Sequence, residues 1–176
     1  MNKRLLIILI VLLITGCAKK ELTQEVKQMG ELKLTSPVFE NNGKIPGKYT
    51  CQGDDINPRL DISGVPSDAK SLVLIMDDPD APAGVWDHWI LFNMPVVSKI
   101  EENSVPSGAV QGKNSWGKNE YGGPCPPSGE HRYVFKLYAL DITLDLDFSA
   151  DKKDVEKAIE EHILAQTKLV GLYSKG

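Results

Sequence analysis

Long apolar and aromatic runs alternate along the chain with stretches rich in turn-forming residues. Residues 70–78 (KSLVLIMDD) form an almost continuous apolar run, typical of a strand buried on both faces. Residues 88–94 and 131–141 are rich in aromatic and β-branched side chains, which also predict strands. Shorter strands are expected at 32–36 and 47–51. The segments between them are full of Gly, Pro, Asn, Asp and Ser, which favour turns.

One amphipathic helix is expected near the end of the chain. Ser149 or Asp151 can cap its first turn, and the charged side chains that follow lie opposite a stripe at helical spacing. The members of this stripe are Val155, Ala158, Ile159, His162 and Ile163. We interpret its histidine as a hydrogen-bonded structural residue. Because strands outnumber helices, the pattern predicts a mainly β fold, a β-sandwich with a C-terminal helix.

Residues 1–16 have the pattern of a secretory signal. Lys3 and Arg4 precede an unbroken apolar run that is too short for a comfortable transmembrane helix. The sequence ITGC, which ends at Cys17, resembles a bacterial lipobox and would imply cleavage before this cysteine and acylation of its thiol. The alternatives are an ordinary signal anchor, or a cysteine that happens to follow an apolar run. The lipobox predicts an extracytoplasmic protein held at the cell membrane by lipid.

The rest of the chain divides into a tether and one domain. Residues 17–30 are polar and are expected to act as the tether, and residues 31–176 have the size of one domain. The net charge of −4, from 20 basic and 24 acidic residues, becomes −6 once Lys3 and Arg4 are removed. The absence of a basic cluster argues against nucleic acid as a partner. Attachment to a membrane would therefore come from acyl chains.

The chain contains 3 cysteines. If Cys17 carries lipid, Cys51 and Cys125 remain in an oxidising compartment. They could form a disulfide or stay as two separate thiols. Sequence spacing does not decide between these alternatives, because bonding depends on how close the two Cα atoms lie.

Polar residues gather where the predicted strands end. Asp78 ends the first buried run, and the prolines and glycine after it force the chain to turn. Strand alternation is expected to place His88 on the same face as Ile90 and Phe92. The stretch between Asp78 and His88 therefore brings a carboxylate and an imidazole to the ends of neighbouring strands.

A third predicted strand opens with His131, which shares a face with Tyr133 and Phe135. Together with Asp78 and His88 it could form one cluster. Two imidazoles can donate hydrogen bonds to an anionic oxygen, while a carboxylate fixes a histidine tautomer or accepts from an ammonium group. The cluster therefore predicts a site for a small phosphate-containing or zwitterionic ligand.

Other chemistry fits the pattern less well. A metal site would need ligand spacings such as His-x-x-x-His or Cys-x-x-Cys, and the sequence has neither. Nucleophilic hydrolysis lacks a Gly-x-Ser-x-Gly elbow, and Ser128 has no evident activating partner. No cofactor is expected. The long segment 104–130 contains Trp116 and Tyr121, which favour an ordered loop of the kind that builds binding sites.

Several uncommon motifs occur in order along the chain. They are DDPDAP at 77–82, WDHW at 86–89 and YGGPCPPSGEHRYVFKLYALD at 121–141, with YTCQGDDINPRL at 49–60. In these motifs the chain resembles the phosphatidylethanolamine-binding protein family, specifically its bacterial and archaeal branch similar to Raf kinase inhibitor proteins. The likeness runs from about Leu32 to the C-terminus. It implies a β-sandwich with a small anion pocket at one end of the large sheet.

The resemblance also implies which residues form that pocket. In such proteins it binds phosphate, acetate or phosphoethanolamine-like groups. The positions that match the family's pocket motifs are Asp78, Asp80, His88, Gly123, Pro126, Pro127, His131 and Tyr133, with Arg132 inside the last motif. Residues 60–64 (LDISG) depart from relatives that often carry a tryptophan there. Nothing matches the C-terminal elements of eukaryotic members, so kinase regulation is not expected.

Three functions are compatible with these residues. The first is a non-enzymatic binding protein that holds a small anion or a phosphorylated headgroup, or presents the pocket to a protein partner. The second is an inhibitor of an extracytoplasmic protease, since the broad family includes peptidase inhibitors. The third is a phosphoester hydrolase with His88 or His131 as general base, which needs a histidine of suitable pKa and a positioned water.

Overall fold

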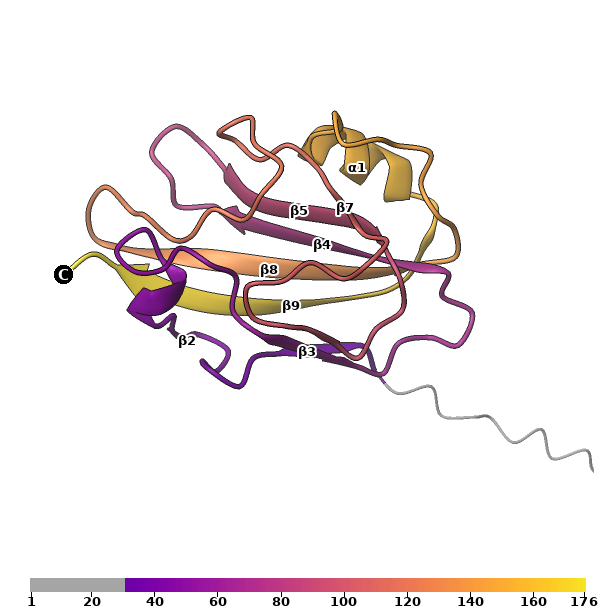
Figure 1. The fold of residues 1–176 in the computed structure, drawn as a ribbon, viewed down its shortest axis with the longest axis horizontal. Helices are drawn as coiled ribbons and strands as arrows, with labels where there is room; N and C mark the ends of the chain where they lie inside the picture. Colours follow the sequence, from indigo (N-terminus) through magenta and orange to yellow (C-terminus); the bar gives the residue numbers. More distant parts are fainter. Residues whose placement is uncertain (1–30) are drawn as a thin grey trace, which may run out of the picture.

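The computed structural model describes residues 31–176 and shows a mainly β fold with one short α-helix (Figure 1). The elements are β1 (Lys33–Thr35), β2 (Gly43–Lys44), a 3-10 helix η1 (Gly47–Tyr49), β3 (Leu60–Ser63), β4 (Ser71–Asp78), β5 (Trp86–Met94), β6 (Lys99–Ile100), β7 (Val110–Gln111), β8 (Glu130–Leu140), α1 (Lys152–Ile159) and β9 (Ile163–Ser174). The predicted signal peptide, the predicted tether and Cys17, the predicted site of lipidation, lie outside the described residues. Within those residues, no helix is long and apolar enough to span a membrane.

Two sheets form the sandwich. The large sheet has the order β2-β9-β8-β4-β5-β7, and the small sheet has the order β1-β3-β6. In Figure 1 the small sheet lies below the large sheet, and α1 lies above the large sheet. One apolar cluster fills the space between the sheets and includes Leu74, Trp89 and Phe135. A second, which includes Ile75 and Phe92, lies between the large sheet and α1. The central strand β4 is buried along its whole length because both of its faces are covered.

The structure confirms four of the five predicted strands. The runs at 70–78, 88–94 and 131–141 correspond to β4, β5 and β8, and the short run at 32–36 corresponds to β1. The prediction for 47–51 is wrong, because this segment opens with η1. There the amide and the hydroxyl of Thr50 both donate to the carbonyl of Gly47, which closes a tight turn.

The predicted helix exists but is shorter than its apolar stripe suggested. Asp151 and Asp154 form a reciprocal capping box that begins α1. The helix buries Val155 and Ile159 against the large sheet and ends there. His162 and Ile163 are therefore not helical, in contrast to the prediction. His162 precedes β9 and Ile163 is its first residue; β9 is a 12-residue strand that the sequence did not predict and that pairs with β8 along its length.

Candidate functional site

Asp77 and Asp78, the last two residues of β4, contact different partners. Asp77 contacts two lysines: Nζ of Lys136 in β8 and Nζ of Lys152 in α1 lie 2.6 and 2.7 Å from its Oδ2. Asp78 faces the opposite way, and Nδ1 of His131 lies 2.7 Å from its Oδ2. Successive strand residues point to opposite faces of a sheet, so the two carboxylates are separated. Of the two, Asp78 is the one that contacts a histidine.

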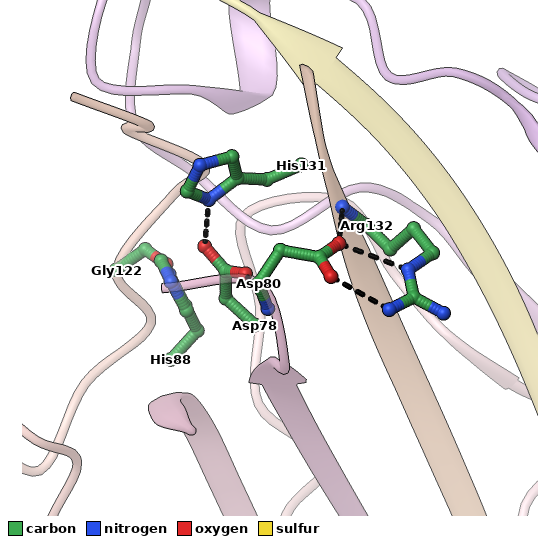
Figure 2. Close-up of polar contacts among 6 residues, drawn as sticks. All are labelled: Asp78, Asp80, His88, Gly122, His131 and Arg132. Atoms are coloured by element: carbon green, nitrogen blue, oxygen red, sulfur yellow. Dashed lines mark hydrogen bonds and ion pairs between the residues drawn. The ribbon is translucent and has the colours of Figure 1, made fainter. Parts of the chain in front are cut away.

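Asp78 and His131 form a buried pair at the point where β4 ends beside the start of β8. The second oxygen of Asp78, Oδ1, accepts from the backbone amide of Asp80 at 2.8 Å. Asp78 and His131 are 3% and 7% exposed, so neither oxygen of the carboxylate is left to bulk water. A carboxylate held in this way fixes the orientation of the imidazole. Figure 2 shows this pair beside His88.

His88 reaches this cluster because β5 contains a bulge. The register passes from Met76 opposite Trp89 to Asp77 opposite Asp87, which leaves His88 as the extra residue. Its ring contacts Tyr133 in the core between the sheets, with ring centroids 5.2 Å apart. The prediction that His88 shares a face with Ile90 and Phe92 is therefore wrong.

The two residues expected to share a face with His88 lie elsewhere. Ile90 and Phe92 belong to the apolar cluster beneath α1. The bulge changes which face each side chain occupies, because an extra residue shifts the alternation of the strand by one position. As a result, His88 and His131 lie on the same side of the sheet.

The protonation of His88 follows from its contacts. Its Nδ1 lies 2.6 Å from the carbonyl oxygen of Gly122, and the amide of Gly122 donates back to the carbonyl of His88 at 3.1 Å. A carbonyl only accepts, so Nδ1 carries the hydrogen. Burial lowers the pKa of His88 below its ordinary value, against the opposing effect of this hydrogen bond. The neutral ring therefore has its unprotonated nitrogen at Nε2.

A pocket of about 420 Å³ opens beside these residues, and we call it the His88 pocket. Its lining consists of Asp78, Ala81, Pro82, Ala83, Trp86, His88, Trp116, Cys125 and Pro127. Three of the predicted site residues, Asp78, His88 and Pro127, are therefore in the lining. A polar floor between apolar and aromatic walls is the usual composition of a small-molecule site.

His131 and Tyr133 lie behind the lining rather than in it. His131 contacts Asp78, and the Tyr133 ring meets His88 edge to face. The hydroxyl of Tyr133 is buried and has no hydrogen-bond partner within residues 31–176. Burial raises the pKa of Tyr133, so the hydroxyl stays protonated.

Asp80 has a different location from the other predicted residues. It accepts from the Nε and Nη2 atoms of Arg132 at 2.9 and 2.6 Å, and from the backbone amide of the same residue at 2.9 Å. Hydrogen bonds from Arg132 lower the pKa of Asp80 to about 2. Figure 2 shows Asp80 turned toward Arg132. Asp80 does not line the His88 pocket and instead joins the loop after β4 to β8.

One wall of the pocket contains Cys125 and Pro127, and the segment that carries them is fastened to the residues after η1. Cys51 and Cys125 form a disulfide, which resolves the two alternatives that the sequence left open. The amide of Gly123 donates to Oδ1 of Asp55 at 2.6 Å. A Cβ atom on Gly123 would lie 2.5 Å from that same oxygen, so only glycine permits the approach. Pro126 is buried behind the exposed Pro127.

Two tryptophans complete the pocket, and the motifs did not assign a role to either. Trp86 and Trp116 meet edge to face with ring centroids 5.4 Å apart, and Trp116 also lies 5.0 Å from His88. The aromatic residues of segment 104–130 indicated an ordered loop, and this loop does place Trp116 at the pocket. No sequence signal indicated its contact with His88.

Asn114 holds the loop around Trp116 in place. Its side-chain oxygen accepts from the amides of Trp116 and Lys118, and its side-chain nitrogen donates to the carbonyl of Glu120.

Among residues 31–176, no group of three histidine, cysteine or acidic side chains could hold a metal ion.

Comparisons with known proteins agree with this architecture. The family model described as phosphatidylethanolamine-binding protein matches residues 35–174. A UPF0098 protein from Methanothermobacter thermautotrophicus is 52% identical over 151 residues, which cover 82% of this chain and 100% of that protein. A crystal structure from Chlamydia trachomatis, described as a candidate homolog of the phosphatidylethanolamine-binding protein, is 44% identical with a TM-score of 0.81, covering 84% of this chain and 99% of that one. YbcL from Escherichia coli, described as a member of the mammalian family, is 29% identical with a TM-score of 0.78, covering 84% and 100%.

Proposed function

The chain belongs to the phosphatidylethanolamine-binding protein family, and on that basis we propose that it binds a small anion or phosphorylated headgroup in the His88 pocket. The observation that carries the proposal is the state of His88. Its Nδ1 is occupied by the carbonyl of Gly122, and its side chain lines a pocket of about 420 Å³. Protonation of Nε2 creates a donor for an anionic oxygen, with a positive charge in partly apolar surroundings.

Asp78, His131 and Tyr133 act as positioning residues in this proposal. Asp78 is bonded to His131 and to the amide of Asp80, so its side chain is fixed before a ligand arrives. The Tyr133 ring supports His88 from the side of the core. Because these groups are already ordered, little conformational entropy is lost when an anion binds.

Binding is coupled to proton uptake in this account. The pKa of His88 is low in the free protein because burial disfavours its charged form. An anion at Nε2 favours that charged form and raises the pKa. The affinity is therefore highest below the pKa of free His88, falls as the pH rises from that pKa toward the higher pKa of the complex, and levels off above it.

Calorimetric titration of the full-length protein with glycerophosphoethanolamine tests the proposal. We expect saturable binding that His88→Ala abolishes. His162→Ala is the matched control, because His162 contacts Asp141 and does not line the His88 pocket. Absence of binding by the unmodified protein, or equal loss in both variants, would rule the proposal out.

We further propose that the protein acts from a membrane surface through a lipid on Cys17, as the lipobox-like sequence indicates. Metabolic labelling with an alkyne fatty acid tests this, and Cys17→Ala should remove the label. A label that persists in this variant would contradict the anchor. The protease-inhibitor and hydrolase hypotheses stay predictions that none of the contacts described above favours.

A further inference from the structure

Two carboxylates face each other across β4 and β5, on the face of the large sheet that carries α1. They belong to Asp77 and Asp87, which are direct partners in the register of the two strands. The side chains of Asp77 and Asp87 are only 1% and 21% exposed. Like charges directly opposite each other destabilise a pair of strands, and the repulsion grows where solvent is excluded. This cross-strand pair therefore needs a neutralising group.

Lys152, the first residue of α1, provides that group. Its Nζ lies 2.7 Å from Oδ2 of Asp77 and 2.9 Å from Oδ1 of Asp87, and its side chain is 14% exposed. Burial acts to lower the pKa of this amine, but its hydrogen bonds to the two carboxylates outweigh burial and the pKa is raised. Lys136 contacts Asp77 alone among the acidic residues of 31–176. Lys152 therefore bridges the two strands, and Lys136 does not.

The pair that Lys152 bridges closes the β5 bulge. On the other side of the bulge, Met76 lies opposite Trp89. A strand without the bulge would continue from there with Asp77 opposite His88, a pairing that we call the slipped register. Opposite residues of neighbouring strands lie on the same face of a sheet, so His88 would then point toward α1 and leave the His88 pocket.

Asp87 faces an aspartate in either register. In the slipped register it would lie opposite Asp78, on the face of the His88 pocket. Asp78 contacts His131 and the amide of Asp80, and no lysine or arginine among residues 31–176 forms an ion pair with it. Lys152 thus neutralises the pair of aspartates in the bulged register alone. This difference favours the bulge.

Asp87 also connects the bulge to the loop that carries Trp116. The amide of Asp87 donates to Oγ of Ser115 at 2.8 Å, and the amide of Ser115 donates to the carbonyl of Asp87 at 2.9 Å. Ser115 directly precedes Trp116, which lines the His88 pocket. The residue that Lys152 holds therefore precedes His88 in the strand and also bonds to the loop of the pocket tryptophan.

We propose that Lys152 is a positioning residue that selects the bulged register of β5 and thereby holds His88 in the His88 pocket. The expected effect on ligand binding rests on the proposed function, whereas the register itself does not. Lys152 does not line the pocket. It acts through the pairing of β4 with β5 and not through contact with a ligand.

Lys152→Met tests the proposal, because methionine is also long and favours helices. NMR without ligand measures the pKa of His88 and the NOE between the rings of His88 and Tyr133, whose centroids are 5.2 Å apart. We expect a second set of His88 signals that lacks this NOE. Its pKa should be higher, because Asp77 is the neighbour of His88 in the slipped register. Affinity for glycerophosphoethanolamine should fall about tenfold, the effect of losing one hydrogen bond to a charged group.

Lys153→Met is the matched control. Lys153 is the next residue of α1 and is exposed, so this change removes the same charge from the same turn. It should preserve one set of His88 signals, the NOE and the affinity. If Lys152→Met also keeps one set of His88 signals with the NOE and pKa of the unmodified protein, the inference is overturned, even if this variant is less stable.

A double variant, Lys152→Met with Asp77→Asn, separates selection of the register from a simple loss of contacts. The second change removes the repulsion from Asp87 in the bulged register and the attraction for His88 in the slipped one. We therefore expect the native His88 signals and most of the affinity to return, although the double variant has fewer ion pairs. A double variant no more native than Lys152→Met would overturn the inference, including the case in which neither protein folds.

The NMR signals need no ligand, so they separate this inference from the proposed function. The expected signals, together with no binding of glycerophosphoethanolamine by the unmodified protein, would support the role of Lys152 and rule out the headgroup site. A loss of affinity in Lys152→Met with unchanged His88 signals would overturn the role of Lys152 and leave the headgroup site in place.

Discussion

Removal of the Cys51–Cys125 disulfide should destabilise the protein strongly and weaken its pocket. The bond joins residues 74 apart in the sequence. Closing a loop of that length lowers the entropy of the unfolded chain, which corresponds to about 4 kcal/mol of stability at 25 °C in the loop-closure model. For a domain of this size such a loss lowers Tm by roughly 10–15 °C.

The pocket should respond because the bond fastens one of its walls. Cys125 lines the His88 pocket, and the amide of Cys51 donates to the carbonyl of Pro124 at 3.2 Å. Without the bond, the wall keeps the contacts of Gly122 with His88 and of Gly123 with Asp55. Anion affinity should therefore fall without being abolished.

The assay is urea denaturation of the unmodified protein and of the Cys51→Ser and Cys125→Ser double variant, with and without a phosphine reductant. The reductant should lower the unfolding free energy of the unmodified protein toward that of the variant. It should leave the variant unchanged. A difference below about 1 kcal/mol between the two proteins would refute the reasoning, because it would mean that the bond does not constrain the unfolded chain.

Two further changes test how the pocket is held. Asp80→Asn should cost about 1 kcal/mol at neutral pH, since the Arg132 pair is partly exposed and screened by solvent. The pKa of Asp80 is depressed to about 2 in the folded protein, so the ion pair stabilises the fold fully at a pH above the pKa of this carboxyl in the unfolded chain. The stabilisation disappears as the pH falls toward 2. If denaturation experiments show the same cost of Asp80→Asn from pH 7 to pH 2, this explanation is contradicted. Gly123→Ala should cost roughly 2 kcal/mol, because its Cβ would meet Asp55 Oδ1 at 2.5 Å and the Tyr49 carbonyl at 2.6 Å. Gly47→Ala is the control, with nothing within 4 Å of the added atom, and equal costs in thermal denaturation would disprove the steric argument.

The sequence predicted those parts of the fold whose physical cause is local. The run at 70–78 is apolar because β4 is covered on both faces, so it could be identified without a structure. β9 could not be identified in this way. Several of its exposed residues are polar, such as Gln166 and Lys168, so the alternation of apolar and polar residues along the strand is weak. His162 and Ile163 also continue the spacing of the helix, although the chain has left the helix by then.

The site was predictable as a set of residues but not as a geometry. The motifs identified Asp78, His88 and His131, and the structure brings all three to one end of the sandwich. The face that His88 occupies depends on the bulge in β5, which arises from the pairing of β5 with β4. The pairing of Asp80 with Arg132 depends on the position of β8 and is likewise non-local.

The measurement that tests the central claim most directly is an NMR titration of the His88 imidazole, with and without glycerophosphoethanolamine. The charge of this ligand does not change between about pH 5 and pH 8, so the shifts report on histidine alone. The account predicts a pKa of His88 below the ordinary histidine value in the free protein and a clear rise of this pKa in the complex. An unchanged pKa of His88 in a saturated complex would contradict the claim that this residue binds the anion.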